Sequence, residues 1–221
     1  MSILSKDLSI IIPIYSGETS HLTLISDLSN LAGESEVILA AATEEDKNQI
    51  FPIKIHWLKC ELGRAKQLNK AAYCAERSNL LFLHADTRMT QKAFDKLLKE
   101  YDVNALNYFD LKFATANPLL RLNEWGVAIR SRILSVPFGD QGFCLSKKTF
   151  QRLGGFDEKT PFGEDHLFVW KARKHQVLVR PLKASLTTSA RKYEKNGWGK
   201  TTLSHVYWTV KQALLANKEK N

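Results

Sequence analysis

The sequence predicts an α/β fold in which helices flank a mostly parallel central sheet. The chain has 221 residues, which is the size of a single domain. Hydrophobic residues make up 44% of it and charged residues 25%, as in globular rather than disordered or fibrous proteins. In its first half, short apolar runs alternate with segments of helical periodicity, which is the pattern of strands joined by crossover helices.

The first half gives the clearest elements. Residues 8–15 form a continuous β-branched apolar run, typical of a strand buried on both faces. Residues 19–31 place leucine and isoleucine on one side of a helix, as an amphipathic helix requires. The same alternation continues along the chain. It predicts strands over 36–42, 53–58 and 79–85, and helices over 63–77 and 91–101.

The second half is less regular, although its elements can still be placed. The spacing predicts a helix over 119–134 with four apolar side chains on one face: Leu122, Trp125, Ile129 and Ile133. Strands are expected over 103–113, 139–146 and 177–181, a short helix before Gly154, a helix over 164–174 and an amphipathic C-terminal helix over 201–215. We therefore expect one domain over residues 1–200, with halves 1–101 and 102–200, and a helical extension over 201–221.

Positive charge is concentrated near the end of the chain. The net charge is +9, but residues 171–221 hold 12 basic and 2 acidic residues and account for +10. Such asymmetry indicates an anionic partner, which can be nucleic acid, a membrane surface or the phosphate groups of a substrate. The three cysteines have no zinc-like spacing and are expected to be buried thiols. No apolar leader is recognised, so we expect a cytoplasmic protein, free or peripheral at the inner face of the membrane.

Polar clusters follow the expected strands, at the edge where open α/β sheets bind ligands. One runs from Tyr15 to Glu18, and a second contains His84 and Asp86. A carboxylate in such a place can bind Mg²⁺ or Mn²⁺, or it can simply cap the next helix or turn. A third cluster, 163–166, opens a helix with two acids. Either they complement the helix dipole, or one of them is a general base.

A glycine and two cations open the helix expected over 63–77. Gly63, Arg64 and Lys66 could hold a phosphate through backbone N–H groups and the guanidinium. The alternative is a solvated start of a helix. The segment is neither a Walker loop nor a G-x-G-x-x-G dinucleotide motif.

The order of these motifs is more specific than any one of them. They are P-x-Y at 13–15, G-R-A-x-Q-x-N at 63–69, H-A-D-T at 84–87, F-G-D-Q-G-F at 138–143, L-G-G-F-D at 153–157, G-E-D-H at 163–166 and T-S-A-R-K-Y-E at 188–194. This arrangement resembles the family 2 glycosyltransferases of the glycosyltransferase A fold. It is most similar to a small bacterial subgroup that carries H-A-D-T in place of the usual D-x-D. The resemblance covers about residues 8–200.

The resemblance implies an inverting, metal-dependent transfer of a sugar from a nucleotide-diphosphate sugar to an acceptor hydroxyl. A Rossmann-like half, 1–101, would bind the donor, and 102–200 the acceptor. Asp86 matches the acid that binds Mn²⁺ or Mg²⁺, Asp165 matches the general base, and Glu164 would support it. The implied donor-binding residues are Pro13, Tyr15, Arg64, Gln67, Asn69, His84, Asp86, Gln141, Arg191 and Lys192. The last two would face the leaving diphosphate, where cations stabilise developing negative charge.

Two departures from the family pattern concern nucleoside recognition. Ala41 falls where relatives carry an acid after the second strand, and Glu18 comes one place later than the acid of P-x-Y-N-E. They motivate an alternative, a degenerate relative that binds a nucleotide or glycan without turnover.

Two further classes fit less well. A nucleotidyltransferase would carry a Gly-rich basic loop directly after the first strand, which Ser16-Gly17-Glu18 does not provide. The basic C-terminal region lacks a nucleic-acid reading motif, so no nucleic-acid partner is expected. The acceptor can be a glycan, a lipid or a small molecule. The C-terminal helix can pack on the domain, form a homodimer or contact a membrane.

Overall fold

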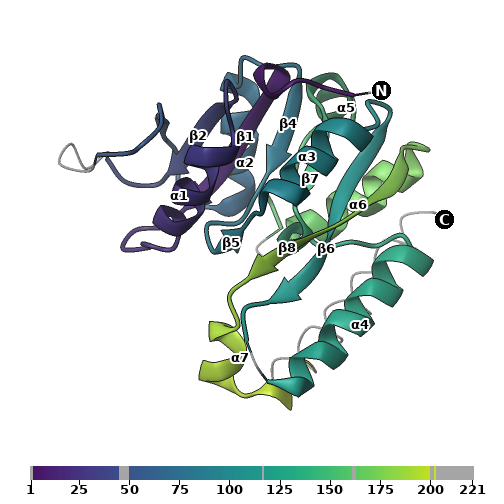
Figure 1. The fold of residues 1–221 in the computed structure, drawn as a ribbon. Coiled ribbons are helices and arrows are strands. Elements are labelled where there is room, and N and C mark those ends of the chain that lie inside the picture. Colours follow the sequence, from purple (N-terminus) through teal and green to yellow (C-terminus); the bar gives the residue numbers. More distant parts are fainter. Residues whose placement is uncertain (1, 45–49, 116, 161–162, 200–201, 203–221) are drawn as a thin grey trace.

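One mixed eight-stranded sheet forms the centre of the molecule (Figure 1). The computed structural model describes residues 2–44, 50–115, 117–160, 163–199 and 202. The strands are β1 (Leu8–Ile14), β2 (Glu36–Ala41), β3 (His56–Lys59), β4 (Asn79–Phe82), β5 (Thr87–Arg88), β6 (Ala105–Phe113), β7 (Phe143–Ser146) and β8 (Leu178–Thr188). Their order across the sheet is β3-β2-β1-β4-β7-β6-β8-β5.

The sheet is mostly parallel, as predicted. β1 pairs in parallel with β2 and β4, β2 with β3, and β6 with β8. β7 runs antiparallel to both β4 and β6, and β5 runs antiparallel to β8. β4 and β6 therefore point the same way, and the carboxyl ends of six strands meet at one edge. Since β4 and β6 are joined through β7, the two expected halves of the domain share one sheet.

Helices cover both faces of this sheet. They are α1 (His21–Leu31), α2 (Arg64–Cys74), α3 (Gln91–Glu100), α4 (Pro118–Ile133), α5 (Lys147–Arg152), α6 (Glu164–Lys174) and α7 (Arg191–Asn196). Two 3₁₀ turns, η1 (Ser5–Asp7) and η2 (Gly139–Gln141), complete the described elements. In Figure 1, α4 and α7 lie below the second half of the sheet, away from β1 and β2.

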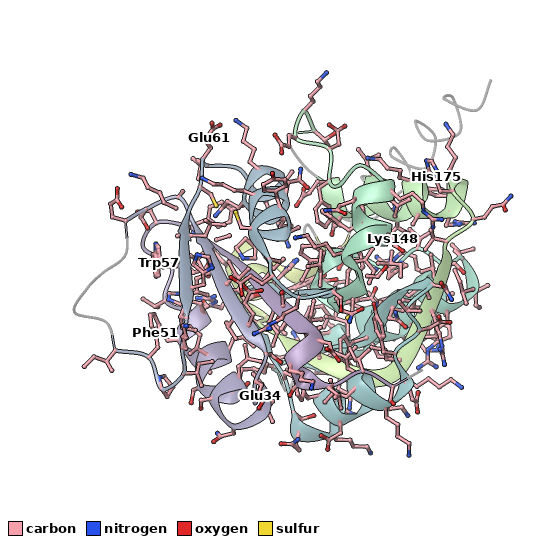
Figure 2. The ribbon with its side chains drawn as sticks, turned by 90° about the horizontal axis from the view of Figure 1, so that it is seen from above. Glu34, Phe51, Trp57, Glu61, Lys148 and His175 are labelled. Carbon is pink, nitrogen blue, oxygen red and sulfur yellow. The ribbon has the colours of Figure 1, made fainter. Side chains whose placement is uncertain are left out.

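The core has two layers because successive strand residues point to opposite faces. Ile10 and Ile12 pack with the apolar sides of α1 and α3, whereas Ile11 packs with those of α2, α5 and α6. All three isoleucines are fully buried, and each such side chain stabilises the fold by about 1.5–3 kcal/mol. Phe51 and Trp57 extend the first layer at the β3 edge, on the opposite side of the molecule from Lys148 and His175 (Figure 2).

The apolar face of α4 is turned mostly outward. Leu122, Trp125 and Ile133 are 59%, 68% and 73% exposed, whereas Leu120 and Ser131 are buried. The reason is a set of polar contacts on the inward side. The hydroxyl of Tyr108 donates to the carbonyl of Ser131 at 2.8 Å, and the Ser131 hydroxyl donates to Gln141 at 2.7 Å. These contacts fix which side of the helix faces the sheet.

Smaller differences occur at the boundaries of elements. The third strand starts at His56 rather than at 53, the short strand β5 was not expected, and 139–141 is a 3₁₀ turn. The last strand continues to Thr188. The C-terminal helix expected over 201–215 lies outside the described residues, apart from Thr202. All three cysteines are free thiols; Cys60 and Cys144 are buried, as expected, whereas Cys74 is only partly buried. Of the helices in the described ranges, none has the length and apolar composition needed to cross a membrane.

Candidate active site

Residues from four distant segments meet at the carboxyl edge of the sheet. The segments that follow β1 and β4 supply Glu18, His84 and Asp86. β7 is antiparallel to its neighbours, so the η2 turn that precedes it lies at the same edge. The amino end of α6 supplies Glu164 and Asp165. The topology thus brings together the three acidic clusters that the sequence separates.

Gly139 is the point where these segments touch. Its backbone N–H donates to Asp165 Oδ2 at 2.5 Å. A Cβ atom at this position would lie 2.8 Å from Asp165 Oδ2 and 3.1 Å from His84 Nε2. Only a glycine lets the η2 turn approach both side chains this closely. Asp165 Oδ1 accepts the backbone N–H of His166 at 2.8 Å, so both oxygens of this carboxylate are hydrogen-bonded.

Arg64 and Glu164 form an ion pair beside this contact. Arg64 Nε lies 3.3 Å from Glu164 Oε1, and the Glu164 side chain is only 8% exposed. Burial raises the pKa of Glu164, while Arg64 opposes that shift. Burial also raises the pKa of Tyr15, which lies in the electrostatic range of Arg64, Glu164 and Glu18. The structure therefore brings Arg64, Tyr15 and Glu164 together.

Asp86 lies in a second group, with Glu18 and Arg191. Burial raises the pKa of Asp86, and the negative charge of Glu18 raises it further, while Arg191 lowers it. Arg191 lies 3.8 Å from Glu18 Oε1, and the hydroxyl of Thr188 donates to Asp86 Oδ1 at 3.4 Å. Glu18 thus lies at the site, although it comes one residue later than the acid of the P-x-Y-N-E pattern.

The imidazole of His84 lies against the η2 turn, where a Cβ at Gly139 would be 3.1 Å from its Nε2. Burial, and then the nearby charge of Arg64, hold its pKa well below the usual value. Lys192 belongs to α7, but its side chain lies outside the described part of the structure.

Four residues from the expected donor set make contacts within the fold. Gln67 is fully buried and donates to the carbonyls of Ile14 and Ala40, at 2.9 and 2.7 Å. Asn69 bonds both the N–H and the carbonyl of Phe156, each at 2.9 Å. The others are Gln141, fully buried with its amide donating to the Phe109 carbonyl at 2.9 Å, and Pro13, buried within β1. We interpret these four side chains as supports for the loops that carry the site.

Asp140 and Arg130 were missed as site residues. Asp140 Oδ1 is buried and has no hydrogen-bond partner in the described residues. Burial raises the Asp140 pKa to about 6, and the charge of Arg130 opposes the shift. Arg130 lies over the Phe138 ring, 3.4 Å from its centre, and donates to the carbonyl of Val136 at 2.9 Å. The acid inside F-G-D-Q-G-F is the sequence feature that could have identified Asp140, because burying a carboxylate is unfavourable unless a partner or a function compensates for it.

The region expected to hold the nucleoside lacks an acid at the end of β2. Ala41 is fully buried there. Glu44, further along, forms an ion pair with Lys59, and the carbonyl of Thr43 accepts the indole N–H of Trp57 at 3.1 Å. Among the described residues at this strand end, no other acid therefore replaces the one that relatives carry at the position of Ala41.

Asp86 and Glu18 are carboxylates at this edge that could hold a divalent cation. No cluster of three or more histidine, cysteine or acidic side chains in the described ranges forms a metal cage. Mg²⁺ commonly takes one or two carboxylates and completes its coordination with water and substrate phosphates. Asp86, partly buried beside the charge of Glu18, is the carboxylate that meets this need.

Comparison with solved structures gives the same architecture. A mannosyltransferase from Pyrobaculum calidifontis, in complex with GDP-Man and Mn²⁺, matches with a TM-score of 0.65 and 14% identity over 94% of this chain and 64% of its own. TarS from S. aureus matches with a TM-score of 0.61 and 18% identity over 83% of this chain and 36% of its own. Residues 1–349 of TarS with UDP-GlcNAc match with a TM-score of 0.59 and 18% identity over 83% of this chain and 58% of that one.

The chain has a glycosyltransferase fold. It spans 36–64% of the length of these structural neighbours. No family model and no curated protein matches the sequence. The predicted fold class is therefore confirmed by structure alone, at low sequence identity.

Proposed function

We propose that this protein is an inverting, metal-assisted glycosyltransferase of family 2, in the subgroup with the H-A-D-T motif. It would move a sugar from a nucleotide-diphosphate sugar to an acceptor hydroxyl. One observation carries the proposal: Asp86, Arg64 and Asp165 converge on one edge of a glycosyltransferase fold. Neighbours with that fold were solved with UDP-GlcNAc, and with GDP-Man and Mn²⁺.

Fixed cations would stabilise the leaving group. When the bond to the anomeric carbon breaks, negative charge develops on the nucleoside diphosphate, and positioned positive charges lower that barrier. Arg64 is held by Glu164. Arg191 is held by the hydroxyls of Ser20 and Ser189 and by the charge of Glu18. Both guanidiniums are thus oriented before a donor binds, which reduces the cost of ordering them.

Asp86 would bind the metal ion. A divalent cation there supplies Lewis-acid stabilisation of the diphosphate when it is bound. Thr188 donates to Asp86 and orients its carboxylate, while Glu18 adds negative charge that favours a cation.

Asp165 would act as the general base. Its two oxygens accept backbone N–H groups, which fix the carboxylate in one orientation. Each carboxylate oxygen retains a further lone pair for an acceptor hydroxyl. A single base that activates a hydroxyl opposite the leaving group gives inversion in one displacement. Glu164 precedes the base Asp165 in the sequence and pairs with Arg64, so it would link the base to the cation that faces the donor.

The first prediction concerns nucleotide binding. We expect the melting temperature to rise with one of UDP, GDP, TDP and CDP, and the rise to depend on Mn²⁺. At about 100 times the dissociation constant, the gain is about 2.7 kcal/mol, or a shift of about 5–10 °C. Asp86→Asn should lose the Mn²⁺-dependent part of that shift because it removes the metal ligand.

Asp95→Asn is the matched control, since Asp95 is an exposed acid on α3 that bonds only Gln91 among the described residues. An Asp86→Asn protein with a full Mn²⁺-dependent shift would refute the metal assignment. Ala41 motivates the alternative of a degenerate relative. A strong nucleotide-induced shift, without sugar release from any matching donor, would favour that alternative.

A further inference from the structure

We propose that the outward face of α4 binds the surface of an anionic lipid bilayer. This face carries four apolar side chains, Leu122, Trp125, Ile129 and Ile133, which together form the α4 stripe. The inference goes beyond the proposed glycosyl transfer and does not depend on it, because binding to a membrane is measured without a donor or an acceptor.

The α4 stripe has the composition and length of a surface that enters a bilayer from one side. Its residues follow the spacing i, i+3, i+7 and i+11, which aligns them along one side of the helix. From Leu122 to Ile133 the stripe is about 16 Å long. Leu122, Trp125 and Ile133 are largely exposed, and apolar groups gathered on a surface in this way mark interaction sites. Tryptophan in particular is enriched where lipid headgroups meet the acyl chains.

The packing of α4 leaves the stripe pointing away from the sheet. Ser131, on the opposite side of the helix, is buried. Its carbonyl accepts the hydroxyl of Tyr108 at 2.8 Å, and its own hydroxyl donates to Gln141 at 2.7 Å. Figure 1 shows α4 at the border of the molecule, beside the second half of the sheet. A stripe in this place can meet a flat surface without a change of fold.

The described segment that follows α7 passes beside the α4 stripe. The indole N–H of Trp198 donates to the carbonyl of Leu119 at 3.2 Å, and the side-chain amide of Asn123 donates to the hydroxyl of Thr202 at 3.1 Å. Leu119 and Asn123 lie roughly a quarter of a turn around the helix from the stripe, because successive residues are about 100° apart. The described chain up to Thr202 therefore runs along a neighbouring side of α4 and leaves the stripe open.

The charges beside the α4 stripe are mostly positive. Arg121 and Arg132 are exposed on α4 next to the stripe, and Arg132 also pairs with Asp110 at 2.7 Å. Lys195 is exposed on α7, which lies beside the amino end of α4 in Figure 1. The one acid of α4, Glu124, turns inward, where its carboxylate accepts a backbone N–H of β6 at 2.7 Å. Cations beside an apolar stripe are the pattern of a helix that lies on anionic lipids.

The same charges argue against a second copy of the chain as the partner. In a twofold dimer the stripe of one copy would pack on the stripe of the other, and the arginines beside both stripes would face like charges. An anionic bilayer instead offers a negative surface potential to the cations and an acyl-chain boundary to the stripe. Charge complementarity therefore favours the lipid surface.

The test is sedimentation of the full chain with lipid vesicles, made of phosphatidylcholine alone or mixed with phosphatidylglycerol. We expect the wild type to bind the anionic vesicles, and to bind them less as the salt concentration rises above about 0.1 M, because salt screens the charges. A variant with both Leu122→Ser and Trp125→Ser should bind about tenfold more weakly, since it loses the apolar contacts. Tyr73→Ser is the matched control. Tyr73 is an aromatic side chain on α2 that is 81% exposed, and its loss should leave binding unchanged.

A second pair of variants separates the charges from the apolar contacts. Arg121→Gln should weaken binding to the anionic vesicles about fivefold, as expected for one cation near a charged surface, and should not alter binding to phosphatidylcholine alone. Lys92→Gln, which removes an exposed cation from α3, should have no effect. Thermal melts and size-exclusion chromatography of each variant check its fold and its oligomeric state.

Three results would overturn the proposal. The first is a wild type that does not bind the anionic vesicles. The second is binding that survives the double substitution at Leu122 and Trp125. The third is a wild type that elutes as a dimer while the double variant elutes as a monomer, which would assign the stripe to a second copy of the chain. A protein that binds vesicles as expected but transfers no sugar would contradict the proposed function and leave this inference standing.

Discussion

Gly139 is the residue on which the geometry of the site depends most directly. Its missing side chain lets the η2 turn touch Asp165 and His84, two residues that are 81 positions apart in the sequence. Sequence reasoning identified both of those residues, because each ends or begins an element next to a polar motif. It gave no role to Gly139 or Asp140. Their importance comes from a contact between η2 and α6, and such long-range contacts leave no periodic signal in a sequence.

We predict that Gly139→Ala lowers transfer at least tenfold. The added methyl group would lie 2.8 Å from Asp165 Oδ2, so the turn or the carboxylate must shift, and a small displacement of a general base has large kinetic effects. Gly126→Ala is the matched control. A Cβ at Gly126, within α4, meets no atom of the described residues within 4 Å, so this change should stabilise the helix by about 0.5–1 kcal/mol. Equal rates of sugar transfer by the two variants would show that Gly139 is only a turn residue.

At the scale of elements, the periodicity predicts which segments are helices and strands better than it predicts their orientation. The strand runs of β1, β2 and β4 are continuous and apolar, so burial on both faces could be predicted from residue type alone. α4 has an equally clear apolar face, yet it turns that face outward. Hydrogen bonds from Tyr108 and Ser131 decide its orientation, and polar contacts of this kind do not follow a helical period.

We predict that Leu120→Ala and Leu122→Ala, two positions apart on α4, differ strongly in their effect on stability. Leu120 is 1% exposed, and its truncation should cost about 2–5 kcal/mol. Leu122 is 59% exposed, and its truncation should change the free energy of unfolding by less than about 0.5 kcal/mol. Urea denaturation of both variants measures the difference. A larger loss from Leu122→Ala would mean that α4 buries its apolar face in solution, contrary to the structure.

At the scale of the whole molecule, the sheet order explains why the site forms where it does. β7 runs against its neighbours, so the turn before it reaches the same edge as the carboxyl ends of β1 and β4. The mostly parallel sheet was predictable from the alternation of apolar runs and helices. The antiparallel insertion of β7 was not, because a four-residue buried strand has no marker of direction. That insertion places the turn with Asp140 at the edge where Asp86 and Asp165 also lie.

The most direct test of the central claim is the consumption of a nucleotide sugar. Purified protein with Mn²⁺ would be incubated with UDP- and GDP-sugars, including UDP-GlcNAc and GDP-Man, and with a protein-free cell extract as the source of acceptors. The released nucleoside diphosphate would be measured for the wild type and for Asp165→Asn. We predict that the wild type consumes one donor and that Asp165→Asn is at least a hundredfold slower while it still binds the nucleotide. Release by the variant at the wild-type rate, or no release from any donor by the wild type, would contradict the proposed glycosyl transfer.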